Sequence, residues 1–239
     1  MRRTGLTMLT TNNRGLRVAV VCAAAIVTVC PAPAVASSDS QLWLTGNITA
    51  DYATRWRFSQ EIITRFSDNR DGLYEVESNT MLGYRFGKKV TLWLGYTHDP
   101  LYAAGNFTQL ERRFRQQLSV DNALKIGRGT VSGRMRLEER WREGASGPGL
   151  RLRPYAKYSL PVRNKLALVV SHETFINLNT TAFQRVQGVD RMRNFAGVNV
   201  PLNRRIGAEV GYLNQYGFVR NGDDTVDHVA ALTLSASFK

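Results

Sequence analysis

Apolar and polar residues alternate one by one over most of the chain, beginning near residue 42. In the first such segment Leu42, Leu44 and Ile48 share one parity, and Thr45 and Asn47 share the other. Because side chains point alternately to the two sides of a strand, this period of two predicts β-strands with one apolar and one polar face. The pattern recurs in roughly eleven segments, so the chain is expected to be all-β.

The last segment, Thr225–Phe238, has the same two faces and ends on an aromatic residue, with Leu232 and Leu234 on the parity of Phe238. A strand with one row of side chains against lipid and the other in a polar interior is typical of a transmembrane β-barrel. The segment also resembles the C-terminal assembly signal of bacterial outer-membrane proteins, with Phe238 as the recognised aromatic. It departs from that signal only in Lys239, which follows the aromatic.

The connections between the segments differ in length, as expected of a barrel with short turns at one end and long loops at the other. The short ones lie at Gly87–Lys89, Pro161–Lys165 and Pro201–Arg205, and the longer polar ones at Pro100–Thr108, Glu143–Gly149, Asn177–Val189 and Gly217–Asp224. Single-chain bacterial barrels have an even number of strands. We therefore expect an antiparallel transmembrane β-barrel of ten strands if Ser37–Asp51 is not a full barrel strand, or of twelve if a long loop conceals another.

Residues 1–36 have the order of a secretory signal peptide. Four arginines precede an apolar run from Val18 to Cys30, and small residues follow the run up to Ala36. The run of about 13 residues is shorter than the roughly 20 that a membrane-spanning helix requires. We expect cleavage after Ala36, export from the cytoplasm, and a mature barrel domain over residues 37–239.

Removal of this segment changes the composition of the mature domain. Both cysteines, Cys22 and Cys30, precede residue 37, so we expect neither a disulfide nor a thiolate metal site. The formal charge of +13 falls to +9 when the four arginines of the leader are subtracted. In an exported protein we do not expect nucleic-acid binding, and this charge predicts either a solvated or paired surface or attraction to lipopolysaccharide phosphates or acidic sugars.

The polar parity of the predicted strands is rich in arginine and glutamate and is expected to line the barrel interior. The lumen-lining candidates are Arg57, Glu61, Glu75, Glu77, Arg113, Arg115, Arg134, Arg136, Glu138, Arg151, Arg153, Arg191 and Arg193. One interpretation is a network of paired Arg and Glu side chains, because barrels of about eight strands have interiors only wide enough for side chains. The other is a passage that favours anions, because unpaired guanidinium groups suit carboxylates, sulfates and phosphates.

Two charged residues fall on the apolar parity, Arg112 and Glu139. An arginine that faces the middle of a bilayer costs about 2 to 4 kcal/mol. We therefore expect a β-bulge or a position near the membrane interface at each of them.

Candidates for catalysis and metal binding are few. None of His98, His172 and His228 is followed two residues later by the serine that outer-membrane phospholipases and lipid A deacylases pair with a barrel histidine. Because a nucleophile needs a base within reach, we predict no catalytic site. The acidic cluster at 223–227 is expected to be a hydrated turn rather than a calcium site. We expect no bound metal and no cofactor.

Several short motifs resemble a bacterial family catalogued as domain of unknown function 2490. They are Gln41-Leu42-Trp43-Leu44-Thr45, Trp56-Arg57-Phe58-Ser59-Gln60-Glu61, Gly83-Tyr84-Arg85-Phe86, Leu94-Gly95-Tyr96 and Glu138-Glu139-Arg140-Trp141. The resemblance extends over nearly all of the mature domain. It implies an outer-membrane β-barrel of unassigned activity and supplies no catalytic residue.

The sequence thus predicts a non-enzymatic outer-membrane β-barrel, either structural or a narrow anion-favouring pore with an Arg/Glu-lined interior. The expected partners are outer-membrane lipid and lipopolysaccharide, the outer-membrane assembly machinery, and small anions or acidic sugars. Two alternatives stay open: an outer-membrane lipid-modifying hydrolase, and a soluble periplasmic β-barrel that binds a small ligand.

Overall fold

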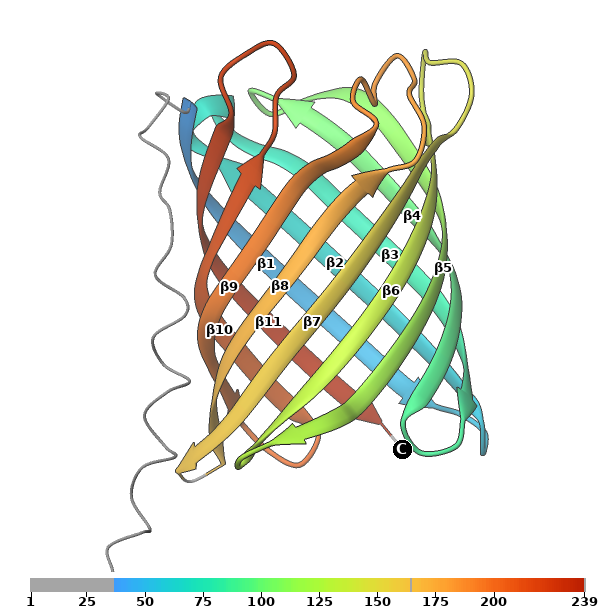
Figure 1. The fold of residues 1–239 in the computed structure, drawn as a ribbon, viewed down its shortest axis with the longest axis vertical. Coiled ribbons are helices and arrows are strands. Elements are labelled where there is room, and N and C mark those ends of the chain that lie inside the picture. The colour runs from blue at the N-terminus through green and yellow to red at the C-terminus, as the bar shows by residue number, and fades with distance from the viewer. Residues whose placement is uncertain (1–36, 164, 239) are drawn as a thin grey trace, which may run out of the picture. The chain divides into compact units, whose positions relative to one another are not determined.

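The computed structural model describes residues 37–163 and 165–238, which form one closed β-barrel (Figure 1). Within these residues there are eleven strands, and each strand neighbours the next one along the chain. They are β1 (Ser37–Asp51), β2 (Trp56–Ser67), β3 (Gly72–Phe86), β4 (Val90–Ala103), β5 (Asn106–Ile126), β6 (Gly129–Arg142), β7 (Gly149–Arg163), β8 (Leu166–Asn177), β9 (Gly188–Pro201), β10 (Ile206–Gly217) and β11 (Thr225–Phe238). The all-β barrel predicted from the alternation is confirmed.

Helix is confined, in the described residues, to the single 3-10 turn η1 (Asp68–Arg70). No helix in this part of the chain is long and apolar enough to cross a membrane. The predicted signal peptide, residues 1–36, and Lys239 lie outside the described residues.

The barrel has a polar interior and an apolar exterior. Of the described residues, seven apolar side chains are buried, whereas the buried polar and charged side chains number twenty-two. Thirty-one large apolar residues are exposed, among them Leu44, Ile48 and Leu94. In each strand the residues of one parity therefore face the interior and those of the other parity face the exterior, as the alternation requires.

The prediction of ten or twelve strands is wrong, because β1 is a full barrel strand and pairs in parallel with β11. The seam is continuous from Ser37 opposite Thr225 to Ala50 opposite Phe238. An even count is needed only when every neighbouring pair is antiparallel. With eleven strands the first and the last run in the same direction, so closure requires one parallel pair, whose hydrogen bonds are evenly spaced but slanted.

The connections of one end of the barrel have at most four residues, whereas the three longest connections lie at the other end (Figure 1). The β1–β2, β3–β4, β5–β6, β7–β8 and β9–β10 connections form one end, which we call the turn rim, and the C-terminus lies there. The β2–β3, β4–β5, β6–β7, β8–β9 and β10–β11 connections form the other end, the loop rim, where β1 begins. The two ends of the described chain therefore lie at opposite rims.

The long connection predicted at Pro100–Thr108 is wrong. Strand β4 continues to Ala103, and only Ala104 and Gly105 join it to β5. Both residues have positive φ, 47° and 75°. Two central residues of positive φ make a turn whose twist matches that of the flanking strands, so a tight hairpin forms without a loop.

The bulges predicted at Arg112 and Glu139 are also absent. Arg112 pairs with Trp141 and Phe114 with Glu139 in an unbroken register. Arg112 is exposed on the outer wall, and Glu139 lies three residues from the end of β6 at the loop rim. The alternative expectation, a position near the membrane interface, stays a prediction for both residues.

Candidate functional site in the barrel lumen

A circuit of contacts runs around the inside of the barrel. Seven of its eight members are charged and alternate in sign, and the eighth is Trp43. We call this circuit the ring. It passes through Arg65 (β2), Glu77 (β3), Arg115 (β5), Glu138 (β6), Arg153 (β7), Glu173 (β8), Arg193 (β9) and Trp43 (β1) before it returns to Arg65. Eight of the eleven strands thus contribute one side chain each.

The ion pairs of the ring are short over most of its length. Arg115 Nη2 lies 2.7 Å from Glu77 Oε1, and Arg153 Nη1 lies 2.8 Å from Glu138 Oε1. The Nε atom of Arg115 lies 2.9 Å from Glu138 Oε1, as an ion pair without hydrogen-bond geometry. Charge-assisted contacts of this length are among the strong ones, because at least one partner is ionised. The ring is therefore tight between β3 and β8.

Trp43 closes the ring between two guanidinium groups. The Cζ atoms of Arg65 and Arg193 lie 4.4 Å and 4.5 Å from the centre of its ring. The indole N–H also donates to Gln41 Oε1 at 2.8 Å. A tryptophan face attracts cations through its quadrupole, so the Trp43 side chain links two like charges that would otherwise repel.

A second aromatic residue supports the same level of the lumen from β8. Phe175 is 1% exposed, and the guanidinium carbons of Arg153 and Arg193 lie 4.3 Å and 4.6 Å from the centre of its ring. Arg151 stacks there as well, at 5.1 Å. The apolar ring thus fixes the side chains of three arginines by stacking while their polar atoms turn to carboxylates.

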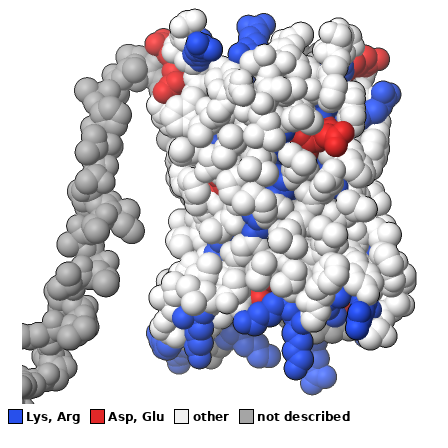
Figure 2. Space-filling model, turned by 45° about the vertical axis from the view of Figure 1, so that its right-hand side comes forward, with Lys and Arg blue, Asp and Glu red and all other residues white. Residues whose placement is uncertain are grey.

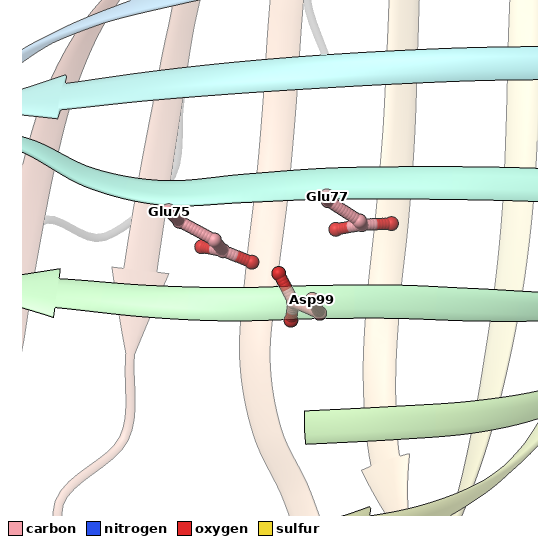
Figure 3. A group of neighbouring side chains, drawn as sticks. All are labelled: Glu75, Glu77 and Asp99. Carbon is pink, nitrogen blue, oxygen red and sulfur yellow. The ribbon is translucent and has the colours of Figure 1, made fainter. Parts of the chain in front are cut away.

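Two acidic side chains, Glu75 from β3 and Asp99 from β4, converge on Glu77 of the ring (Figure 3). The nearest oxygens of these three carboxylates lie within 4.8 Å of one another, a spacing that a cation could bridge. Arg113 contacts all three carboxylates, including Glu77 Oε2 at 3.2 Å. A guanidinium group therefore supplies the positive charge at this place, and the geometry is that of an ion-pair cluster.

Nearer the loop rim, Glu111 gathers three arginines. Its carboxylate accepts from Arg113 Nε at 2.6 Å, from Arg140 Nε at 2.8 Å and from Arg142 Nη2 at 2.6 Å. Glu111 has no exposed surface. A carboxylate that is both fully buried and surrounded by donors has its desolvation offset by those contacts, so these arginines are already engaged.

The ring separates two cavities. The larger, about 600 Å³, opens toward the loop rim, and Glu77 forms part of its wall. The smaller, about 270 Å³, lies on the side of the turn rim, and Asn79 forms part of its wall. Arg115 contacts both Glu77 and Asn79, lines neither cavity and is fully buried. At this level Arg115 therefore lies between the two cavities.

The lumen-lining candidates from the sequence all have inward positions. Glu75, Glu77, Arg113, Arg151, Arg153, Arg191 and Arg193 line the larger cavity, Arg57, Glu61, Arg134 and Arg136 line the smaller, and Arg115 and Glu138 lie between the two. The site also contains Arg65, Glu111, Arg140 and Glu173, which lie on the same polar parity as the candidates, and Asp99 and Arg142, which sequence reasoning missed. Asp99 shares the parity of Thr97, so extending the alternation past Pro100 would have found it.

The three histidines lie on the outer face and are exposed. His172 contacts the side chains of Asn194 and Thr174, and His228 contacts the hydroxyl of Tyr212 at 2.6 Å. Among the described residues, no serine side chain bonds to any of them. Each histidine is thus remote from the charged lumen, on the side of the wall where apolar residues predominate.

Two acidic side chains of the cluster at 223–227, Asp224 and Asp227, accept local hydrogen bonds. Asp224 accepts from the Tyr216 hydroxyl at 2.5 Å and from the backbone N–H of Val219 at 2.9 Å. These hydrogen bonds lower the pKa of Asp224. Asp227, on β11, accepts from the side-chain amide of Gln215. Such contacts organise the β10–β11 loop as a hydrogen-bonded turn.

A family of proteins of unknown function, DUF2490, matches residues 40–226 of the chain. The chain belongs to this family. The match covers all eleven strands except the first residues of β1 and most of β11. The resemblance inferred from the short motifs is thereby confirmed at the level of the family.

One curated relative is an uncharacterised protein of Methylorubrum extorquens. It is 26% identical over 202 residues, which cover 82% of this chain and 86% of that protein. No solved structure matches the chain. The relatives therefore assign no activity to the lumen, and its function has to be argued from its own side chains.

Proposed function

We propose that the protein is an integral β-barrel of the bacterial outer membrane, exported through a cleaved signal peptide, with a lumen closed by the ring. In this proposal the barrel is structural and non-enzymatic, binds no cofactor, and has outer-membrane lipid as its surroundings. The observation that carries the proposal is the distribution of side chains, with charges inside and large apolar residues outside.

The exterior supports the membrane part of the proposal. A soluble barrel buries apolar residues and exposes polar ones, whereas here the fully buried side chains include Arg115, Glu111 and Glu138. Large apolar residues such as Leu94 and Val210, 50% and 48% exposed, cover the outer wall. In a lipid bilayer, the apolar side chains of such a wall would contact hydrocarbon instead of water.

Fractionation tests the location. We expect the mature protein in the outer-membrane fraction, soluble only in detergent, with heat-modifiable migration on gels. Recovery of the folded barrel from the periplasm without detergent would refute the membrane proposal and favour the soluble, ligand-binding alternative.

Assembly offers a second test through Phe238. This residue ends β11 on the outer wall, is 42% exposed, and lies opposite Ala50 across the seam. In the proposal it is the aromatic that the assembly machinery recognises. Phe238→Ala should lower the amount of folded protein in the outer membrane but leave export and signal cleavage intact.

Loss of the aromatic also removes apolar burial worth about 2 kcal/mol, so a yield alone does not separate recognition from stability. Deletion of Lys239 is the control, because it restores a terminal aromatic and should be neutral or favourable. Normal assembly of Phe238→Ala, or equal damage from deleting Lys239, would contradict the role of Phe238.

The ring supports the proposal of a closed lumen. Arg115 and Glu138 are fully buried and line neither cavity, and a lumen filled by side chains would leave no path for ions. In a planar bilayer, purified wild-type protein should give no resolvable channel. The double variant Arg115→Ala/Glu138→Ala, if it folds by the gel-migration criterion, should open a path between the cavities and conduct.

A narrow anion-favouring pore is the second candidate, and one observation favours it. Nine arginines line the larger cavity against five acidic residues. Arg70 and Arg191 have no carboxylate oxygen within 4.0 Å among the described residues, whereas most of the others are paired with Glu111, Glu138, Glu173 or their neighbours. Anion-selective conductance of the wild type would establish this candidate and refute the closed lumen.

The lipid-modifying hydrolase is the third alternative. It requires a serine or water activated by a histidine at the outer wall, and the contacts of His172 and His228 run to asparagine, threonine and tyrosine side chains instead. Release of fatty acid from phospholipid or lipid A vesicles by the purified protein, abolished in His172→Ala or His98→Ala, would replace the structural proposal with an enzymatic one.

A further inference from the structure

The turn rim is strongly basic. All five of its connections carry lysine or arginine, and none carries aspartate or glutamate. We call the connection residues Arg55, Lys88, Lys89, Arg128, Lys165, Arg204 and Arg205 the basic rim. Figure 2 shows lysine and arginine side chains gathered along this end of the molecule.

The loop rim has the opposite balance although its connections are longer. They contain five acidic residues, Asp68, Asp71, Glu143, Asp223 and Asp224, and three basic ones, Arg70, Arg185 and Arg220. The formal charge of the connections is thus −2 at the loop rim and +7 at the turn rim, by subtraction of those counts. These counts include only the connections at the two ends of the barrel and exclude the charged residues of the lumen.

The basic rim is not neutralised by neighbouring acids. All seven residues are exposed, and none forms an ion pair with a described residue. Two acids lie nearby. Asp51 is engaged by Arg57 and Arg85, each at 2.8 Å, and Asp121 is exposed. Seven positive charges against these two leave a positive field, which dissolved salt at ordinary concentration screens only beyond about 8 to 10 Å.

An exposed apolar residue precedes the basic residue in every connection of the turn rim. The pairs are Tyr52 and Arg55, Phe86 and Lys88, Ile126 and Arg128, Val162 and Lys165, and Leu202 and Arg204. The apolar members are 48% to 60% exposed. An apolar side chain followed within two or three positions by a cation marks a boundary between hydrocarbon and a polar layer.

We propose that the basic rim binds the phosphate groups of anionic phospholipids in the membrane leaflet that faces the turn rim. The proposal rests on the membrane location proposed above. The apolar member of each pair places the connection at the edge of the hydrocarbon, and the basic member then reaches the headgroup phosphates. Anionic surfaces attract clustered lysine and arginine over a Debye length.

Competition between two phospholipids that differ in headgroup charge tests the proposal. The folded full-length barrel in detergent receives equimolar phosphatidylglycerol and phosphatidylcholine, and native mass spectrometry counts the lipids that stay bound. We expect retained phosphatidylglycerol to exceed phosphatidylcholine about fivefold at low salt, and to lose most of this preference at 0.5 M salt.

The variants locate the preference on the rim. Lys88→Gln/Lys89→Gln should reduce it, and adding Arg204→Gln/Arg205→Gln should bring it close to onefold. The matched control Arg185→Gln/Arg220→Gln removes two arginines from the loop rim and should leave the preference unchanged. Gel migration before and after heating establishes that each variant is folded, so a loss of preference is not a loss of structure.

Three results would overturn the proposal. They are an unchanged preference in the four-residue variant, an equal loss in the loop-rim control, and retention of purified lipopolysaccharide by the basic rim in place of phosphatidylglycerol. Failure here is distinguishable from failure of the membrane location, because a barrel that fractionates with the outer membrane but lacks headgroup preference refutes only the role of the rim.

Discussion

Two parts of the barrel wall fill the lumen in different ways. The charged wall, β5 to β8, presents long inward side chains such as Arg115, Glu138 and Arg153, which meet one another across neighbouring strands. The small-residue wall, β9 to β11, presents Gly197, Gly211 and other short inward residues, including Gly207, Ala231, Thr233 and Ser235. The same alternation therefore supports two kinds of packing.

The small-residue wall is held by close backbone approach rather than by ion pairs. Gly197 and Gly211 lie opposite each other on β9 and β10, and the aromatic side chain of Phe195 covers both. A Cβ atom at Gly211 would lie 2.4 Å from the carbonyl oxygen of Ala196 and 2.7 Å from the Phe195 ring. On this wall the single aromatic side chain of Phe195 packs against the strands, whereas on the charged wall several charged side chains pair with one another.

Two ion pairs connect the two walls within the described residues. One joins Glu173 on β8 to Arg193 on β9, at 4.0 Å, and belongs to the ring. In the other, Lys157, on β7, bonds through Nζ to Glu209 Oε2, on β10, at 2.6 Å. Both side chains are partly exposed within the lumen. Charge is thus concentrated where the ring closes the lumen and is sparse near the seam, so the two walls should respond differently to substitution.

The largest effect is expected from Glu138→Ala. Glu138 is fully buried and holds Arg115, Arg151 and Arg153 at 2.6 Å to 2.9 Å. Removal of one partner leaves uncompensated buried charge, which typically costs about 3 to 5 kcal/mol, so we expect a loss of that size. Urea unfolding in detergent measures it. Glu143→Ala, in the exposed β6–β7 loop, is the control and should change stability little.

An intermediate effect is expected from Gly211→Ala on the small-residue wall. The added methyl group meets backbone on β9 and cannot be accommodated by a side-chain movement alone, so we expect a loss of about 1 to 3 kcal/mol. Gly46→Ala, on β1, is the matched control, because a methyl group added there would have nothing within 4 Å. Equal stability of the two variants in the same unfolding assay would show that close approach does not hold this wall.

The seam itself is tested by cysteine pairs, since no cysteine occurs after residue 36. Leu44 and Leu232 lie opposite each other in the parallel pair. Leu44→Cys/Leu232→Cys should cross-link on mild oxidation and shift the mobility of the unreduced protein, with little effect on stability when reduced. Leu44→Cys/Leu234→Cys, offset by two residues, should cross-link poorly. The reverse order of yields would contradict the parallel register.

The smallest effect is expected from Arg191→Gln, which lies on β9 at the border between the two walls. Its guanidinium has no carboxylate partner within 4.0 Å in the described residues, and its side-chain hydrogen bond runs to Gln215 at 3.5 Å. We expect stability to change by less than about 0.5 kcal/mol. A loss comparable to that of Glu138→Ala would place Arg191 in the network of the charged wall.

The alternation of residues determined a large part of this fold. It predicted an all-β barrel whose strands have one apolar and one polar face. This prediction is confirmed, because side-chain direction in a strand depends only on parity, which is local in the sequence. The tight turn after Ala103 was not predicted. Proline and glycine are typical of loops, but here Pro100 fits a strand position and Gly105 a turn position.

Only the tertiary structure decided which distant residues meet. The strand count depends on how the first and last strands close the barrel, and the parallel pairing of β1 with β11 leaves no mark on the alternation. The ring likewise depends on register between strands, because Glu77 and Arg115 are far apart in sequence and meet only when β3, β4 and β5 are aligned. Parity depends only on the position of each residue along its strand, whereas register and barrel closure depend on how all the strands pair.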